Sequence, residues 1–158
     1  MPITLNRSLR EKKLRLLSWG EYRILSAICH RIVPIANTFR GLDLAWKIDF
    51  ILAGVSKQMG REFKLLLLVF EYGAPLLGPP FKRFTKMNEV EQDSYLANWE
   101  QSRLPFKRMG FQVLKRAVLA AYYGSQQAWS RIGYGGPWLR RGYPHNYPGK
   151  DIVHLHED

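Results

Sequence analysis

The sequence YLANWEQSRLPFKRMGFQVLKRAVLAAYYGSQQAWSRIGYGGPW, residues 95–138, decides the fold. It contains two helical patterns separated by Pro105, and it ends in an aromatic, glycine-rich turn. Proline is favoured in the first turn of a helix, where its missing N–H is not needed. Apolar residues recur at helical intervals from Phe106 to Tyr122, with Gly110 among them. We therefore predict that Pro105 opens a helix and that Gly110 lets another helix approach closely.

Two further helix starts have the sequence signature of a capping box. Ser18 is followed three residues later by Glu21, and Asn88 is followed three residues later by Glu91. Pro34 ends the first of these helices, because the residue before a proline is disfavoured in helical geometry. The second is expected to run over residues 88–103.

The middle of the chain predicts two more helices. One is expected to begin near Asp43 and to end at Gly60. The next is expected over residues 61–72, and its four consecutive leucines predict a central, buried helix. Residues 73–80 contain three prolines and two glycines, so we predict a break in regular structure there.

The whole chain of 158 residues has the length of about one domain. We predict an all-α protein whose core is a compact bundle of about five helices, residues 18–138. A basic N-terminal arm, residues 1–17, precedes the bundle, and an extended C-terminal tail, residues 139–158, follows it. The only strand pattern longer than a few residues is at 151–155.

The charge of the chain is strongly positive. Lys and Arg total 24 against 13 acidic residues, which gives a formal net charge of +11. Such a charge attracts nucleic acid, anionic lipid or an acidic protein, although a solvated basic surface explains it equally well. Basic residues flank the last two predicted helices, but the aromatic residues nearby fall on the apolar stripe, so nucleic acid is the minor alternative.

A search for catalytic constellations finds few candidates. The sequence has no glycine-rich nucleotide-binding motif, no HExxH motif and no pair of cysteines. Cys29 fits a small core residue, and His154 and His156 make a poor metal site by themselves. Asp49 and Glu71 lie beside apolar stripes and are the only acids that attract attention. We predict no catalytic, cofactor-binding or metal-binding residue in this chain.

Several positions in residues 95–138 follow a recognisable order. They are Trp99, Ser102, Arg103, Phe111, Leu114, Tyr122, Tyr123, Trp129, Ile132, Gly133, Tyr134, Gly136 and Pro137. The earlier pattern from Leu17 and Ser18 to Val33 and Pro34 belongs to the same order. With these features, residues 18–138 resemble the gluconate 2-dehydrogenase subunit 3 family, the small subunits of membrane-associated flavoprotein dehydrogenases.

The resemblance implies a non-catalytic accessory subunit. Its partner would be a large subunit of the glucose–methanol–choline oxidoreductases, which holds FAD and the catalytic histidine and oxidises an alcohol or a sugar. A cytochrome c or membrane subunit is a possible third component. The residues expected to contact the partner are Trp99, Arg103, Tyr122, Tyr123, Trp129, Tyr134, Trp138, Tyr143 and Tyr147. About half of the aromatic residues are expected in the core instead, with Trp138 and the tail tyrosines the best interface candidates.

The sequence departs from this family at its start. Many members begin with a twin-arginine export signal, whereas this chain shows neither the arginine pair nor an apolar segment after it. Gly135 also stands where the family's turn often has proline. We therefore expect a cytoplasmic protein or one peripheral on the inner membrane, or a periplasmic one if a partner carries it. The alternative function is a stand-alone basic helical module that binds nucleic acid or an anionic membrane; an enzyme in its own right has the least support.

Overall fold

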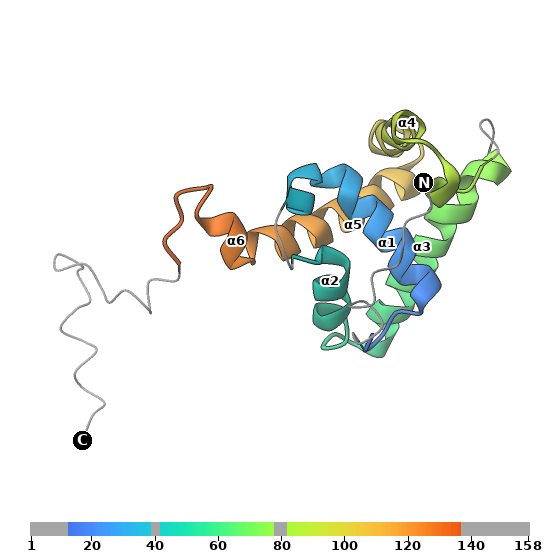
Figure 1. Ribbon diagram of the computed structural model, residues 1–158. Helices are drawn as coiled ribbons and strands as arrows, with labels where there is room; N and C mark the ends of the chain where they lie inside the picture. Colours follow the sequence, from blue (N-terminus) through green and yellow to red (C-terminus); the bar gives the residue numbers. More distant parts are fainter. Residues whose placement is uncertain (1–12, 39–41, 78–81, 137–158) are drawn as a thin grey trace, which may run out of the picture. The chain divides into compact units, whose positions relative to one another are not determined.

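A computed structural model describes residues 13–38, 42–77 and 82–136 of the chain (Figure 1). The described residues form α-helices and short 3-10 helices and contain no strand, which confirms the predicted all-α fold. The predicted strand at 151–155, the tail and most of the basic arm lie outside the described residues. In chain order the elements are α1 (Trp19–Ile32), η2 (Pro34–Thr38), α2 (Leu44–Leu52), α3 (Lys57–Leu77), η3 (Phe84–Lys86), α4 (Glu89–Glu100), α5 (Pro105–Tyr123) and α6 (Gln126–Trp129).

The chain divides into two compact units, Met1–Tyr122 and Tyr123–Asp158. The first unit contains α1 to α4 and all of α5 except its last residue, and the second contains α6 and the turn that follows it. The boundaries expected after residues 17 and 138 stay predictions.

Both predicted capping boxes are present. The backbone N–H of Ser18 donates to Glu21 at 2.7 Å, and the Glu21 N–H donates back to the Ser18 hydroxyl at 3.3 Å. The Asn88 N–H donates to Glu91 and the Glu91 N–H donates to the Asn88 side chain, both at 2.9 Å. These bonds satisfy N–H groups that a helix start leaves unpaired. Pro105 is the first residue of α5, as predicted.

Helix α1 is the element around which the first unit packs. It contacts α2, α3 and α4 as well as both 3-10 helices, and Leu25 and Ile28 on it are completely buried. Ion pairs join its two ends to neighbouring helices. Near its start Glu21 accepts from Lys64 of α3 at 3.4 Å, and near its end Arg31 contacts Asp93 of α4.

Two predicted helix ends are wrong. Helix α2 ends at Leu52 and not at Gly60, which lies in the first turn of α3 beneath the side chain of Leu16. The Ser56 hydroxyl accepts the backbone N–H of Met59 at 3.2 Å and so caps a new helix start that the sequence pattern had hidden. Helix α3 also continues to Leu77, through residues 73–77, where a break was predicted. A proline lacks a backbone N–H and its ring crowds the preceding turn of a helix. Only two residues of α3 follow Pro75.

The prediction that the leucine-rich helix is buried is wrong for one of its faces. Leu67 and Phe70 of α3 lie in the core, but Leu65 is 61% exposed, and Leu68, Val69 and Tyr72 are exposed as well. The helix lies against α1 and η3, and it is apolar on its outer face too. A continuous apolar run contains no polar positions that would show which face points outward.

Apolar residues are exposed on the other helices as well, including part of the stripe predicted from Phe106 to Tyr122. Phe50 and Ile51 of α2, Val90 of α4, and Phe106, Met109 and Val113 of α5 are exposed. The buried face of α5 instead contains Gly110, Phe111, Leu114, Val118, Ala121 and Tyr122. Each of these helices has more apolar residues than its contact with the rest of the unit covers.

Candidate functional site

The two buried acids that attracted attention in the sequence hold segments of the chain together. The Asp49 carboxylate accepts the backbone N–H groups of Arg15, Leu16 and Leu17 at 2.7, 3.0 and 2.7 Å. The Glu71 carboxylate accepts the backbone N–H of Thr85 at 3.0 Å and also its hydroxyl. These bonds compensate the cost of burying the two carboxylates. Asp49 fixes the end of the N-terminal arm to α2, and Glu71 fixes η3 to α3.

A second group of polar residues joins α1 to the start of α2. The Tyr22 hydroxyl donates to Asp43, the N-cap of α2, at 2.6 Å. Burial, and then this carboxylate, raise the pKa of Tyr22, and burial followed by the same carboxylate raises that of Cys29. Burial lowers the pKa of the neighbouring His30. A buried neutral thiol is a weak nucleophile, so these residues form a structural junction between α1 and α2.

Among the residues that the structure describes, no group of three or more His, Cys, Asp or Glu side chains is arranged to hold a metal ion. Within the same residues, no helix combines the length and the hydropathy of a membrane span.

Two of the residues predicted at the interface lie in the core of this chain. Trp99 is 1% exposed and Tyr122 is also buried. Trp99 belongs to a buried aromatic cluster with Phe70, Phe84 and Tyr95. The ring of Phe70 is the centre of this cluster, with centroids 4.7 Å from Trp99 and 4.8 Å from Phe84. Trp99 and Tyr122 are therefore not accessible to a partner in this structure.

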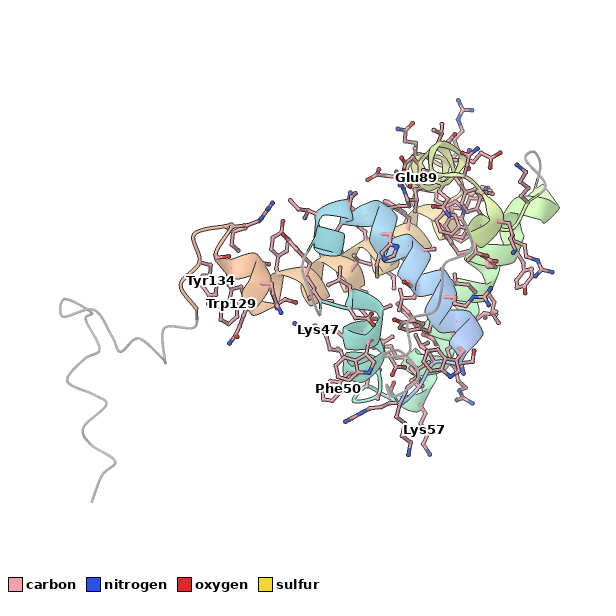
Figure 2. The ribbon with its side chains drawn as sticks, in the orientation of Figure 1. Lys47, Phe50, Lys57, Glu89, Trp129 and Tyr134 are labelled. Atoms are coloured by element: carbon pink, nitrogen blue, oxygen red, sulfur yellow. The ribbon has the colours of Figure 1, made fainter. Side chains whose placement is uncertain are left out.

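Other predicted interface residues gather in an aromatic turn formed by Trp129, Tyr134 and Gly136. Figure 2 shows Trp129 and Tyr134 next to each other, and their rings meet edge to face with centroids 5.4 Å apart. The Trp129 indole N–H donates to the Tyr123 carbonyl at 2.8 Å. Gly136 has φ 97°, a conformation that favours glycine, and a Cβ there would lie 3.3 Å from the Trp129 ring.

The aromatic turn is partly open to solvent. Tyr134 is 42% exposed and Tyr123 is 50% exposed. Arg103 is exposed in the loop between α4 and α5. Trp138, Tyr143 and Tyr147 lie outside the described residues. Of the nine residues predicted at an interface, Arg103, Tyr123 and Tyr134 are therefore described and exposed.

The structure shows a candidate surface that the sequence pattern had assigned to the core. Residue Leu66 of α3 lies against Gly110 of α5 so closely that a Cβ on Gly110 would come within 2.7 Å of it. Among the exposed apolar residues of the two helices, Val69, Phe106 and Val113 are three or four positions from Leu66 or Gly110, and Leu65 and Met109 immediately precede these two residues. We call them the α3–α5 apolar surface: Leu65 and Val69 on α3, and Phe106, Met109 and Val113 on α5.

Comparison with known proteins finds one partial similarity. Over 65 residues, the chain is 32% identical to the long-chain-alcohol oxidase FAO4A of Arabidopsis thaliana. The match covers 37% of this chain and 9% of the plant protein, so the chain spans less than a tenth of the length of the relative it matches. No family model matches the chain, and no solved structure matches it.

Proposed function

We propose that this protein is a non-catalytic accessory subunit that binds and stabilises the FAD-containing catalytic subunit of an oxidoreductase acting on an alcohol or a sugar. The observation that carries the proposal is the partial similarity to a long-chain-alcohol oxidase, which links the chain to glucose–methanol–choline type enzymes. The matched segment makes up only 9% of that oxidase. A helical segment that is a small part of one enzyme is a reasonable counterpart of a small subunit in another.

The α3–α5 apolar surface supports the proposal. Monomeric soluble proteins seldom expose contiguous apolar patches without a function, and such patches often mark binding sites for other proteins. Five large apolar side chains, contributed by two packed helices, would gain from burial against a partner. Leu66 of α3 approaches Gly110 of α5 closely, which brings the two helices together at that point.

The test is co-expression of the tagged full chain with a glucose–methanol–choline type flavoprotein encoded beside it. We expect the two chains to purify together as a yellow complex with the absorbance of bound FAD. The substitution Val69→Asp should lower the recovery of flavoprotein at least tenfold, because it places a charge in the buried interface. Val90→Asp is the matched control, because Val90 is 78% exposed on α4, outside the α3–α5 apolar surface.

Purification of a colourless chain that never associates with the flavoprotein would contradict the proposed function. Equal loss of flavoprotein with Val69→Asp and Val90→Asp would contradict the assignment of the surface. A further variant, Tyr134→Ala, tests whether the aromatic turn, the interface expected from the sequence, contributes as well. A cytochrome c or membrane subunit as a third component stays a prediction, as does the cellular location.

A further inference from the structure

We propose that this protein binds anionic membrane surfaces through the corner where α2 meets α3. This α2–α3 corner consists of the exposed apolar residues Phe50, Ile51 and Met59 and the basic residues Lys13, Arg15, Lys47, Lys57 and Arg61. The inference goes beyond the proposed function, because it concerns a different surface and a different kind of partner. It is tested on this chain alone.

Specific contacts hold the parts of the corner together. The backbone of Arg15 is fixed to α2 by Asp49, and its guanidinium lies 4.1 Å from the centre of the Phe50 ring. Leu16, the next residue, packs on Gly60 in the first turn of α3. The end of the N-terminal arm therefore lies across the ends of both helices and brings its positive charges to them.

Helices α2 and α3 contribute the remaining residues of the α2–α3 corner. Phe50 and Ile51 lie in the last turn of α2, and Met59 lies in the first turn of α3, only a short loop away. Lys57 and Arg61 are one helical turn apart and share a face of α3. Figure 2 shows Lys47, Phe50 and Lys57 at the same end of the first unit.

The charge at this corner is mainly positive. Residues 13–17 and 44–61 contain five basic residues and one acid, Asp49, which is buried and bonded to the arm. Glu62, beside Arg61 on α3, is exposed and adds one negative charge; its carboxylate accepts from the neutral Gln58 amide. Apolar side chains surrounded by lysine and arginine are what an anionic lipid surface accommodates, because the apolar groups enter the headgroup boundary while the cations meet lipid phosphates.

The opposite charge pattern occurs on α4, which carries Glu89, Glu91 and Asp93 around the exposed Val90. In Figure 2 Glu89 lies well away from Lys57 and Phe50. Arg31 pairs with Glu89 and Asp93, and Lys82 pairs with Glu91, so these acids are largely neutralised. Because α4 itself contains no Lys or Arg, a negative surface would attract the α2–α3 corner and not this helix.

A nucleic acid is the rival polyanion. Proteins that bind single strands use aromatic rings on which the bases stack. The α2–α3 corner has one exposed aromatic ring, Phe50, which the Arg15 guanidinium already covers on one face, and its other apolar members are aliphatic. Aliphatic side chains gain from contact with acyl chains and cannot stack on bases, so the composition favours lipid.

The test is sedimentation of the full chain with vesicles. We expect binding to vesicles of phosphatidylcholine mixed with phosphatidylglycerol, little binding to pure phosphatidylcholine, and weakening as salt is raised. The triple variant Lys57→Gln, Arg61→Gln and Lys13→Gln should lower the partition coefficient about a hundredfold, since each charge near an anionic surface contributes about fivefold. The charge-matched control replaces Lys86, Arg103 and Arg116 by Gln, all exposed outside the corner, and should change binding far less.

A second pair of variants separates the apolar contribution from charge alone. Ile51→Ser with Met59→Ser should weaken binding at least tenfold, whereas Val69→Ser with Val113→Ser, on the α3–α5 apolar surface, should not. All four residues are exposed, so we expect both variants to fold, which their circular dichroism spectra check.

Three results would overturn the inference. They are equal loss of binding with both charge triples, no effect of the Ile51 and Met59 pair, and displacement of the chain from vesicles by a short single-stranded RNA. Loss of flavoprotein association with intact vesicle binding would remove the proposed function and leave this inference standing.

Discussion

The buried aromatic cluster and the aromatic turn use the same kinds of residue in different surroundings. In the first, Trp99, Phe70 and Phe84 are almost completely buried, between α3, η3 and α4. In the second, Trp129 and Tyr134 also meet ring to ring, but Tyr134 is exposed. Trp99 of the cluster and both Trp129 and Tyr134 of the turn had the same prediction, an interface with a partner. The comparison shows that aromatic content alone does not tell whether a chain covers its own rings, because that depends on which helices pack over them.

The largest effect is expected from Phe70→Ala, which removes the central ring of the buried aromatic cluster. Phe70 is fully buried and its ring contacts those of Phe84, Tyr95 and Trp99. Truncating a buried phenylalanine costs about 3–5 kcal/mol, because the transfer energy is lost and a cavity remains. Urea denaturation followed by circular dichroism measures this loss. A loss below about 1 kcal/mol would mean that the cluster does not support the fold.

A smaller loss is expected from Gly110→Ala. The added methyl group would lie 2.7 Å from Leu66 and 3.1 Å from the Trp99 ring. Overpacking of this kind costs about 1–3 kcal/mol. Alanine recovers about 1 kcal/mol of helix propensity, so the net loss is expected to be at most about 2 kcal/mol. The matched control is Gly20→Ala in the first turn of α1, where a Cβ meets only the Ser18 hydroxyl at 3.9 Å. A gain in stability from Gly110→Ala as large as that from Gly20→Ala would contradict the close approach of α3 and α5.

Alkaline pH should weaken the buried aromatic cluster through Tyr95. Burial raises the pKa of Tyr95 from 10.0 to about 12, and the nearby Glu71 carboxylate adds to the shift. The folded state holds this proton more tightly than the unfolded state does. The contribution of Tyr95 to the free energy of unfolding is therefore fully present below pH 10 and is lost as pH rises through about 12. We expect a loss on the order of 1 kcal/mol, since solvent partly screens the group.

The measurement for Tyr95 is the free energy of unfolding at neutral pH and near pH 11, with Tyr95→Phe as the comparison. The variant lacks the titrating hydroxyl, so its stability should decline less with pH. Tyr22, whose pKa is also raised, is present in both proteins, so its contribution to the loss of stability at high pH is the same in both. An identical pH dependence of the two proteins would contradict the assignment.

The smallest effect on stability is expected from Trp129→Ala in the aromatic turn. The substitution removes the hydrogen bond to the Tyr123 carbonyl and the contact with Tyr134. Because these contacts are local and partly exposed, we expect a loss of at most about 1 kcal/mol. Denaturation curves of Trp129→Ala and Phe70→Ala, measured together, make the comparison direct. A loss as large as that of Phe70→Ala would show that the turn is part of the main cooperative core.

The sequence predicted where helices start better than it predicted which face of each helix is buried. Ser18 with Glu21, Asn88 with Glu91, and Pro105 each marked a helix start correctly, because capping depends on residues only three positions apart. The predicted end at Gly60 failed, because glycine is only a weak helix breaker and the cap at Ser56 was overlooked. Three of the predicted interface residues, Trp138, Tyr143 and Tyr147, lie outside the described residues and stay predictions.

The faces could not be read from the sequence, for a physical reason. In α3 nearly every position from residue 65 to residue 70 is apolar, so no periodicity distinguishes Phe70, which is buried, from Leu65, which is exposed. The hydrogen-bond partners of Asp49 and Glu71 could not be read from the sequence either. The partners of Asp49 lie 32 to 34 residues away along the chain, and that of Glu71 lies 14 residues away.

By itself, the sequence determined that this protein is helical, where most helices start, and that it carries a large positive charge. These properties depend on neighbouring residues and on composition, which the sequence contains in full. Tertiary structure decided which apolar residues remain on the surface, that Arg15 joins Phe50 at the α2–α3 corner, and that Trp99 belongs to the core. Each of these depends on helices distant in sequence coming together, and the free energy of that packing is shared among many weak contacts that no short motif records.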